Sequence, residues 1–387
     1  MIWNYHWDPD QMNRGEPYYS SLIRILVFFV FLESLPVRGQ NIDVVSEDVV
    51  SLSDITYNLR SGIGVTDNVL YSNNNEVSRS YAVIGLDLTA FQIRGDEREF
   101  SVFLSADHEQ YFESDPVDSE SFVLAMAEYR HHLYNNWWIG LGSEYLYIDQ
   151  LLDLSADDDF NIVQATGHSF GILPTVEKKL AGDWIVSLDI PWRRQYYNDP
   201  LDDYTEASPE LMLSYKTGQY SQLRLKANLE YRGYDSRTIH GSLSPHQLSD
   251  ILNFERSGVD LRYRHYLDHS RKWRSTTVLG FLNNKDNGDG YYNYDRFTAK
   301  QELLYKANSL QIRSGIGLSN YHYANQKDDT QNQLRRKRVV RAEIRASYAV
   351  RDNLKIFSAY RFERSLSNSS YDNYRANNVS VGMEWEF

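Results

Sequence analysis

Apolar and polar residues alternate with a period of two over long stretches of this chain, and this pattern constrains its fold more than any other feature. The clearest stretch is residues 223–232, where Leu223, Leu225, Ala227, Leu229 and Tyr231 alternate with Arg224, Lys226, Asn228, Glu230 and Arg232. Residues 184–192 and 340–348 repeat the pattern. Because successive side chains of a strand point to opposite faces, each stretch predicts a β-strand with one apolar and one charged face. Soluble sandwiches and barrels both contain such strands.

The connections between the alternating segments distinguish these two architectures. Sixteen segments are predicted, at 55–66, 80–93, 99–111, 122–133, 137–147, 162–179, 184–194, 209–216, 221–233, 256–267, 273–282, 294–305, 310–321, 336–349, 354–364 and 374–387. Short turns such as 134–136 alternate with longer polar stretches such as 234–255 along the whole series. This alternation is typical of bacterial outer-membrane barrels, which have short periplasmic turns, long extracellular loops and periplasmic termini. We therefore predict an all-β fold, a transmembrane antiparallel up-and-down β-barrel of about 16 strands, with 14 or 18 as alternatives.

An apolar run precedes the predicted barrel. Residues 22–32 (LIRILVFFVFL) are too few for a spanning helix, which needs about 20 apolar residues. They fit the hydrophobic region of a secretory signal peptide, and a buried N-terminal helix is the alternative. We expect a signal peptide over 1–39 with its true start at Met1 or Met12, a periplasmic segment over 40–54 and an outer-membrane barrel over 55–387.

The composition agrees with a membrane barrel and argues against nucleic-acid binding. The chain has 30 Tyr, 16 Phe and 8 Trp, yet its mean hydropathy is only −0.56, because alternation spreads the apolar residues thinly. Aromatic residues near segment ends are expected to form interfacial girdles: Tyr57, Trp137, Trp138, Tyr147, Trp184, Trp192, Trp273 and Trp385. The whole chain carries a net charge of −13, the wrong sign for a nucleic-acid partner. With no cysteine, no thiolate metal site is possible, and we expect neither a metal nor a cofactor.

The last segment carries the most specific resemblance to known proteins. In residues 377–387 (NNVSVGMEWEF), one face presents apolar side chains and ends at the terminal Phe387. This segment resembles the C-terminal strand by which the barrel assembly machinery recognises outer-membrane proteins. The resemblance implies that Trp385 and Phe387 form an assembly signal. It also implies that outer-membrane lipids, lipopolysaccharide and the assembly machinery are partners of the chain.

Two further stretches resemble hairpins of known barrels. Residues 360–377 are similar to the last hairpin of outer-membrane β-barrel porins and to the barrels of surface lipoprotein assembly modifiers. Residues 64–70 (GVTDNVL) resemble the first hairpin of the same porins. The assembly modifiers carry a periplasmic helical-repeat domain before the barrel, and residues 40–54 are too few to form one. The resemblance therefore favours a porin-like protein.

Charged residues on the inward-facing positions form the candidate pore lining. The basic members are Arg224, Lys226, Arg232, Arg262, Arg264, Arg296, Arg313, Arg341, Arg345 and Arg361, and the acidic members are Asp87, Asp107, Glu109, Glu128 and Glu144. Large barrels enclose an aqueous channel, and charges on facing walls select the ions and solutes that pass. The alternative is pairing within the wall, where carboxylates such as Glu230, Glu343 and Glu363 neutralise the arginines.

These features favour a porin-like channel for hydrophilic, anionic or polyhydroxylated solutes, with no catalytic residue. One alternative is an outer-membrane secretion or assembly component for an exopolysaccharide or a surface protein, with a periplasmic helical-repeat protein as partner. A second is an outer-membrane hydrolase based on Ser169, which lies in a G-x-S-x-G pattern over 167–171. That pattern requires a strand-to-helix turn, whereas here it lies inside a predicted strand. Neither the solute nor the oligomeric state is predicted.

The polar stretches give two further predictions. Asp153, residues 157–159 and residues 199–203 predict a solvated acidic rim rather than a calcium site, because their spacing matches no calcium-binding loop. In the longest stretch, 234–255, Ser244, Pro245 and Gln247 indicate the start of a helix, and Leu248, Ile251 and Leu252 follow on one of its faces. This helix is expected either on the extracellular rim or folded into the pore as a constriction.

Overall fold

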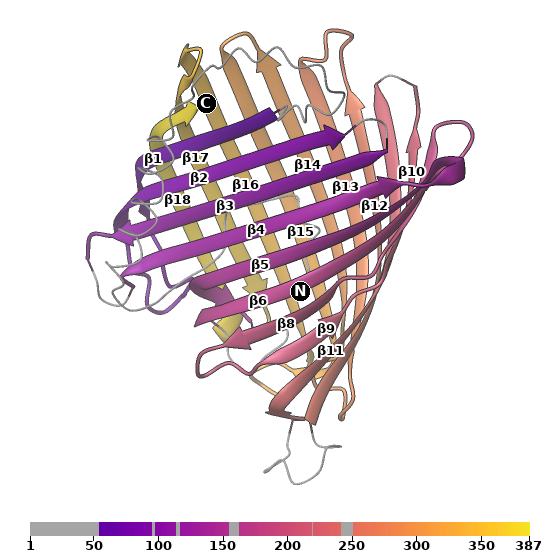
Figure 1. Ribbon diagram of the computed structural model, residues 1–387. Helices are drawn as coiled ribbons and strands as arrows, with labels where there is room; N and C mark the ends of the chain where they lie inside the picture. The colour runs from indigo at the N-terminus through magenta and orange to yellow at the C-terminus, as the bar shows by residue number, and fades with distance from the viewer. Residues whose placement is uncertain (1–53, 95–96, 114–116, 155–161, 219, 241–250) are drawn as a thin grey trace, which may run out of the picture.

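The computed structural model describes residues 54–94, 97–113, 117–154, 162–218, 220–240 and 251–387. The predicted signal peptide over 1–39 and nearly all of segment 40–54 lie outside these ranges. The described residues form one antiparallel sheet that closes on itself, because β1 (Asp54–Thr66) pairs with both β2 (Arg79–Arg94) and β18 (Tyr374–Glu386). Figure 1 shows β1–β6 and β12–β18 as two facing walls of this barrel. Within the described ranges, no helix is long and apolar enough to cross a membrane.

Eighteen strand segments make up the sheet. The others are β3 (Arg98–Tyr111), β4 (Ser119–His132), β5 (Trp137–Asp153), β6 (Ile162–Lys179), β7 (Trp184–Asp189), β8 (Trp192–Tyr197), β9 (Tyr204–Ala207), β10 (Glu210–Lys216), β11 (Ser221–Thr238), β12 (Ile251–Tyr266), β13 (Trp273–Asp286), β14 (Tyr294–Ala307), β15 (Leu310–Lys327), β16 (Leu334–Arg351) and β17 (Leu354–Ser367). Two 3₁₀ turns, η1 (Tyr134–Asn136) and η3 (Ser370–Asp372), lie in the connections β4–β5 and β17–β18.

The eighteen described segments form sixteen strands, because two of the strands are each interrupted and counted as two segments. Segments β7 and β8 both pair with β6 and are halves of one strand. Likewise β9 and β10 both pair with β11. The interruptions contain Pro191 and Pro209, and proline has no N–H to donate to the sheet. The strand number predicted from the sequence is confirmed.

Several strands continue beyond their predicted ends. Strand β5 reaches Asp153, β11 reaches Thr238, and β12 begins at Ile251, all within stretches predicted as loops. A tilted strand crosses a membrane with about 9–11 residues. These longer strands therefore extend beyond the membrane, and their ends form hairpins on the extracellular side. The helix predicted in 234–255 is wrong at its C-terminal end, since Ile251 and Leu252 belong to β12. The rest of that helix, up to residue 250, lies outside the described residues.

The outer face is an apolar belt, as predicted. Leu188, Leu225 and Ile344 point outward with 41%, 44% and 47% of their surface exposed. Backbone groups within a bilayer must be paired internally, and a closed sheet leaves no edge unpaired. The apolar belt and the closed sheet together are the architecture of a transmembrane barrel.

Aromatic pairs lie at the periplasmic ends of several strands. Trp184 stacks on Tyr215 with ring centroids 4.3 Å apart, and Trp273 lies against Tyr305 at 4.4 Å. These pairs fit the predicted interfacial girdle. The girdle prediction is wrong for Trp138, which is buried on the inner face, where Arg130 and Lys179 contact its ring.

Lysine substitutions along β11 test the depth of this belt. Leu223 lies opposite Tyr215 of the girdle, so Leu225 is one outward position deeper in the belt and Leu229 is three. We expect the cost of lysine in unfolding free energy to increase from Leu225→Lys to Leu229→Lys, where it should reach about 2–4 kcal/mol. Urea titrations in lipid vesicles measure it, with the inward-facing Asn228→Lys as control. An equal cost of lysine at Leu225, Leu229 and Asn228 would contradict the assigned faces.

Candidate functional site

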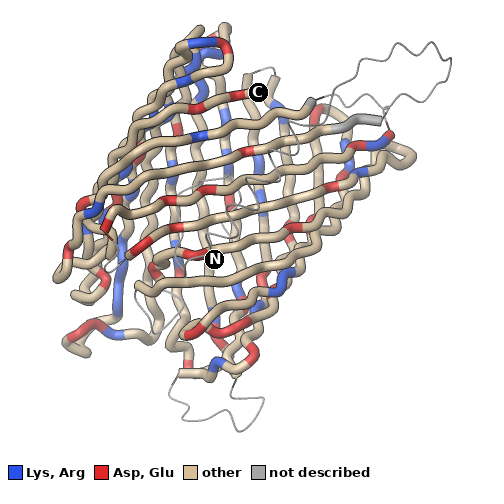
Figure 2. The backbone as a smooth tube through the Cα atoms, turned by 60° about the vertical axis from the view of Figure 1, so that its left-hand side comes forward, with Lys and Arg blue, Asp and Glu red and all other residues tan. Residues whose placement is uncertain are grey.

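All fifteen charged residues predicted to line the pore lie on the inner face of the barrel. Strand register shows this, because residues directly opposite one another share a face and Leu225 and Ile344 define the outer one. The acidic members come from β2–β5 and the basic members from β11, β12 and β14–β17. Figure 2 shows acidic residues along the near wall and basic residues recurring along the strands behind it.

The acidic wall is largely neutralised by arginines that the sequence analysis did not select. Arg60 of β1 lies 3.5 Å from Asp87 and donates a hydrogen bond of 2.7 Å to Asp107. Arg193 of β8 donates to Glu144 at 2.8 Å. Arg60 occupies an inward position of the first predicted segment, so the alternation itself could have identified it. These carboxylates therefore do not form an uncompensated acidic surface.

Much of the basic wall is also paired. Arg341 makes a two-point contact with Glu363 at 2.7 and 2.9 Å, and Arg345 binds Glu384. Lys226 binds Glu210 at 2.6 Å. For these residues, the alternative of pairing within the wall is the one that the structure supports.

A buried charge network extends this pairing towards the extracellular side. Arg232 donates to Glu206 at 2.8 Å, and Arg256 donates to Glu230 at 2.5 Å. All four side chains are buried, and removal of one partner from such a network leaves an uncompensated charge at high cost. Glu206 was missed because it lies in the short segment β9, which the sequence analysis assigned to a loop.

Three inward arginines near the periplasmic end form a cluster on two adjacent strands. Arg224 of β11 lies directly opposite Arg262 of β12, and Arg264 is two residues further along the same face. Arg264 donates to the side chain of Gln222 at 2.6 Å. In the described part of the chain, none of the three forms a salt bridge. Like charges placed directly opposite one another destabilise a sheet, so fold stability alone does not explain this cluster.

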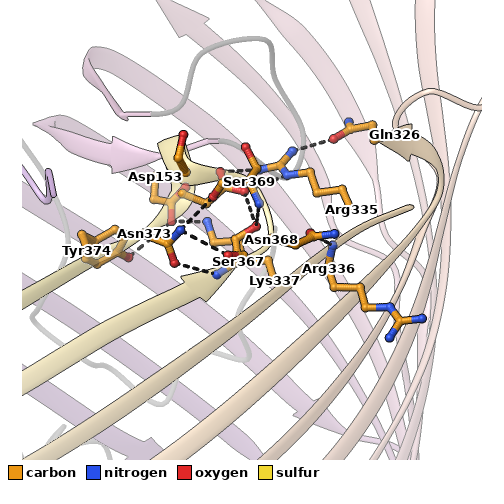
Figure 3. A network of polar contacts seen from close by, with 12 residues as sticks. Asp153, Gln326, Arg335, Arg336, Lys337, Ser367, Asn368, Ser369, Asn373 and Tyr374 are labelled. Atoms are coloured by element: carbon orange, nitrogen blue, oxygen red, sulfur yellow. Dashed lines mark hydrogen bonds and ion pairs between the residues drawn. The ribbon is translucent and has the colours of Figure 1, made fainter. Parts of the chain in front are cut away.

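At the extracellular mouth, a contact crosses the lumen. Asp153, at the end of β5, binds Lys337 of β16 and accepts a hydrogen bond of 3.3 Å from the Tyr374 hydroxyl of β18 (Figure 3). Six strands separate β5 from β16 on the shorter path around the sheet. Arg335, two residues before Lys337 in β16, binds Asp372 of η3 and, at 2.5 Å, Gln326 of β15. The prediction that Asp153 belongs to a solvated rim is therefore wrong.

The first extracellular connection folds into the same region. In residues 67–78, the side chain of Asn68 donates to the Arg375 carbonyl at 2.8 Å, and Val69 is buried. Tyr71 packs edge-on against Tyr374 at 5.4 Å, and its burial raises the pKa of its hydroxyl, so Tyr71 stays neutral. A constriction was predicted only for stretch 234–255. The apolar run Val69-Leu70-Tyr71 inside a polar loop was the missed signal.

The geometry around Ser169 does not support a hydrolase. Ser169 is buried on the inner face of β6, opposite Gln195 of β8. The adjacent His168 points to the other face, where it contacts the Tyr145 hydroxyl at 2.9 Å. A nucleophilic serine needs a base within hydrogen-bond reach, and His168 cannot serve as one. Among the residues that the structure describes, no group of three or more His, Asp or Glu side chains could hold a metal ion.

Comparisons with known proteins give similarity in structure only. No family model and no curated protein matches the chain. Among solved structures, it is similar to an anion-selective porin from Comamonas acidovorans, with 10% identity, a TM-score of 0.47 and coverage of 86% of this chain and 99% of that one. It is also similar to OccAB4 of Acinetobacter baumannii, with 8% identity, a TM-score of 0.49 and coverage of 87% of this chain and 99% of that one. A third similar structure is a bacterial polysaccharide outer membrane secretin, with 10% identity, a TM-score of 0.45 and coverage of 88% of this chain and 99% of that one.

Similarity at this level does not assign a function, and the molecule's own features define its class. The sheet closes without a free edge, its outer face is an apolar belt with aromatic pairs, and its inner face is charged. A closed antiparallel barrel with these two faces is the architecture by which proteins span the bacterial outer membrane. The chain is an outer-membrane β-barrel.

Proposed function

We propose that this protein is a channel for hydrophilic solutes, and that anionic or polyhydroxylated solutes pass most readily. The observation that supports this most strongly is the cluster of Arg224, Arg262 and Arg264, which face the lumen without a salt bridge in the described part of the chain. Desolvated charges require partners. All three side chains are only partly buried, which fits contact with water in an aqueous pore.

Arginine suits the selection of such solutes. Its guanidinium stays charged and presents a planar fork of donors, which binds carboxylates and phosphates at two points. The same donors bind hydroxyl groups of sugars. Although the chain carries a net charge of −13, the field inside the pore depends on the residues that line it. Because most charges of the acidic wall and of the basic wall near the extracellular mouth are paired, the arginine cluster dominates this field near the periplasmic end.

Replacing two of these arginines tests the proposal. In planar bilayers with a salt gradient, the double variant Arg262→Ser, Arg264→Ser should shift the reversal potential towards cation preference. The shift should shrink at about 1 M salt, where the screening length falls to about 3 Å. The matched control is Arg336→Ser with Arg338→Ser, which removes the same charge from exposed positions of β16. An unchanged reversal potential at low salt would contradict the proposed selectivity, and absence of any conductance would contradict the channel itself.

A further inference from the structure

A small cavity opens into the lumen near the β1–β18 seam, on the extracellular side of the arginine cluster. It is lined by residues of β1, β3, β4, β5, β17 and β18, and by Val69 and Tyr71 of the first extracellular connection. Its described lining contains three carboxylates, those of Asp107, Glu109 and Glu120, and one cationic side chain, that of Arg361. Arg60 compensates the charge of Asp107, and the two remaining carboxylates outnumber the single charge of Arg361, so a cationic ligand is favoured over an anionic one.

The atoms without a partner in this cavity are acceptors. Gln150 is only 4% exposed, and its Oε1 atom is buried without a hydrogen bond. Asp107 uses Oδ1 to bind Arg60, while its Oδ2 is buried without a hydrogen bond. Glu109 accepts no hydrogen bond and forms no salt bridge with the residues that the structure describes. A buried acceptor without a donor costs free energy, so this site is incomplete as it stands.

We propose that this cavity binds a small primary ammonium ion. An ammonium group has three N–H donors and no acceptor, which matches the unsatisfied atoms of Asp107, Glu109 and Gln150. Tyr71, Tyr111 and Phe122 complete the lining with aromatic surface, against which a short carbon chain or the cation itself can pack. A neutral polyol has no positive charge to pair with the carboxylates and would add acceptors that the cavity does not need. The site is separate from the arginine cluster and needs no conductance to be occupied.

Three small hydroxylated probes distinguish the basis of binding in the native protein. Ligand-observed NMR titrations of the full-length barrel in detergent micelles give the Kd of ethanolammonium, choline and glycerol. Choline has the same charge and hydroxyl as ethanolammonium but no N–H donor. We expect ethanolammonium to bind about tenfold or more tightly than choline, and glycerol more weakly still. Equal affinity for ethanolammonium and choline would overturn the proposal, because charge or aromatic contact alone would then explain the binding.

Two variants place the ligand in the cavity. Glu109→Gln removes the charged acceptor, and Gln150→Leu removes the buried amide at similar volume. Both should raise the Kd of ethanolammonium, the first about tenfold or more. Glu113→Gln is the matched control. Glu113 follows β3, the strand that contains Glu109, but it is mostly exposed and does not line the cavity. Equal weakening by Glu109→Gln and Glu113→Gln would refute the site, whereas a barrel that binds ethanolammonium without conducting would refute only the channel.

Discussion

Deleting Phe387 should remove most of the folded protein from the outer membrane while leaving export across the inner membrane intact. Phe387 ends the strand that closes the barrel, where its N–H donates to the Tyr57 carbonyl at 2.9 Å and its carbonyl accepts from the Tyr57 N–H at 3.1 Å. The two rings stack with centroids 4.9 Å apart. The deletion therefore removes both the predicted recognition end of the chain and the last contacts of the seam.

These two effects are separated by comparing the amount of folded barrel in the outer membrane of cells with the stability of the same protein refolded in detergent. Two hydrogen bonds and one aromatic pair together contribute about 2–4 kcal/mol, which weakens a large barrel without preventing its folding. We therefore expect the variant to refold in detergent with reduced stability, yet to be nearly absent from outer-membrane fractions, as measured by the gel mobility of unheated samples. The control Tyr57→Ala loses the ring stack but keeps the C-terminal residue. It should reach the membrane at much higher levels than the deletion variant.

The opposite result would also be informative. If both variants fail to the same extent in cells, the seam contact rather than recognition of Phe387 explains the loss. If the deletion variant accumulates normally, the resemblance of residues 377–387 to an assembly signal has no functional consequence.

The sequence predicted the number of strands and their faces because both depend on a local pattern. Leu225 is outward and Arg224 inward through the alternation of β11 alone. The same locality explains why the two interrupted strands did not alter the strand number, since Pro191 and Pro209 interrupt the pairing without reversing the chain.

Strand ends and contacts across the lumen could not be predicted in this way. Above the membrane both faces of a hairpin meet water or protein, so the end of β5 at Asp153 has no apolar alternation to reveal it. The pairing of Asp153 with Lys337 depends on how the closed sheet brings β5 and β16 together, which no local pattern contains. The pairing of Arg232 with Glu206 depends likewise on β9, a segment of four residues.

Breaking the contact between Asp153 and Lys337 should widen the mouth of the pore. Lys337 is buried, and Asp153 lies beside it and the Tyr374 hydroxyl. Loss of one partner from a buried ion pair costs about 3–5 kcal/mol if the other stays in place. Because Asp153 is at the free end of a hairpin that extends beyond β4, moving this end away from the lumen costs less than leaving the carboxylate unpaired.

We therefore expect Lys337→Met to raise single-channel conductance severalfold in planar bilayers. Asp153→Asn should raise it by a smaller amount, because an amide can still form a hydrogen bond with the Tyr374 hydroxyl. The exchange Asp153→Lys with Lys337→Asp restores the opposite charges and should return conductance towards the native value. Lys355→Met is the control, because Lys355 binds Glu386 between the adjacent strands β17 and β18 and spans no part of the lumen. If Lys337→Met conducts as the native protein does, solutes pass elsewhere in the mouth and the contact is structural. If the charge exchange behaves like the single variants, the pairing of Asp153 with Lys337 does not control the width of the mouth.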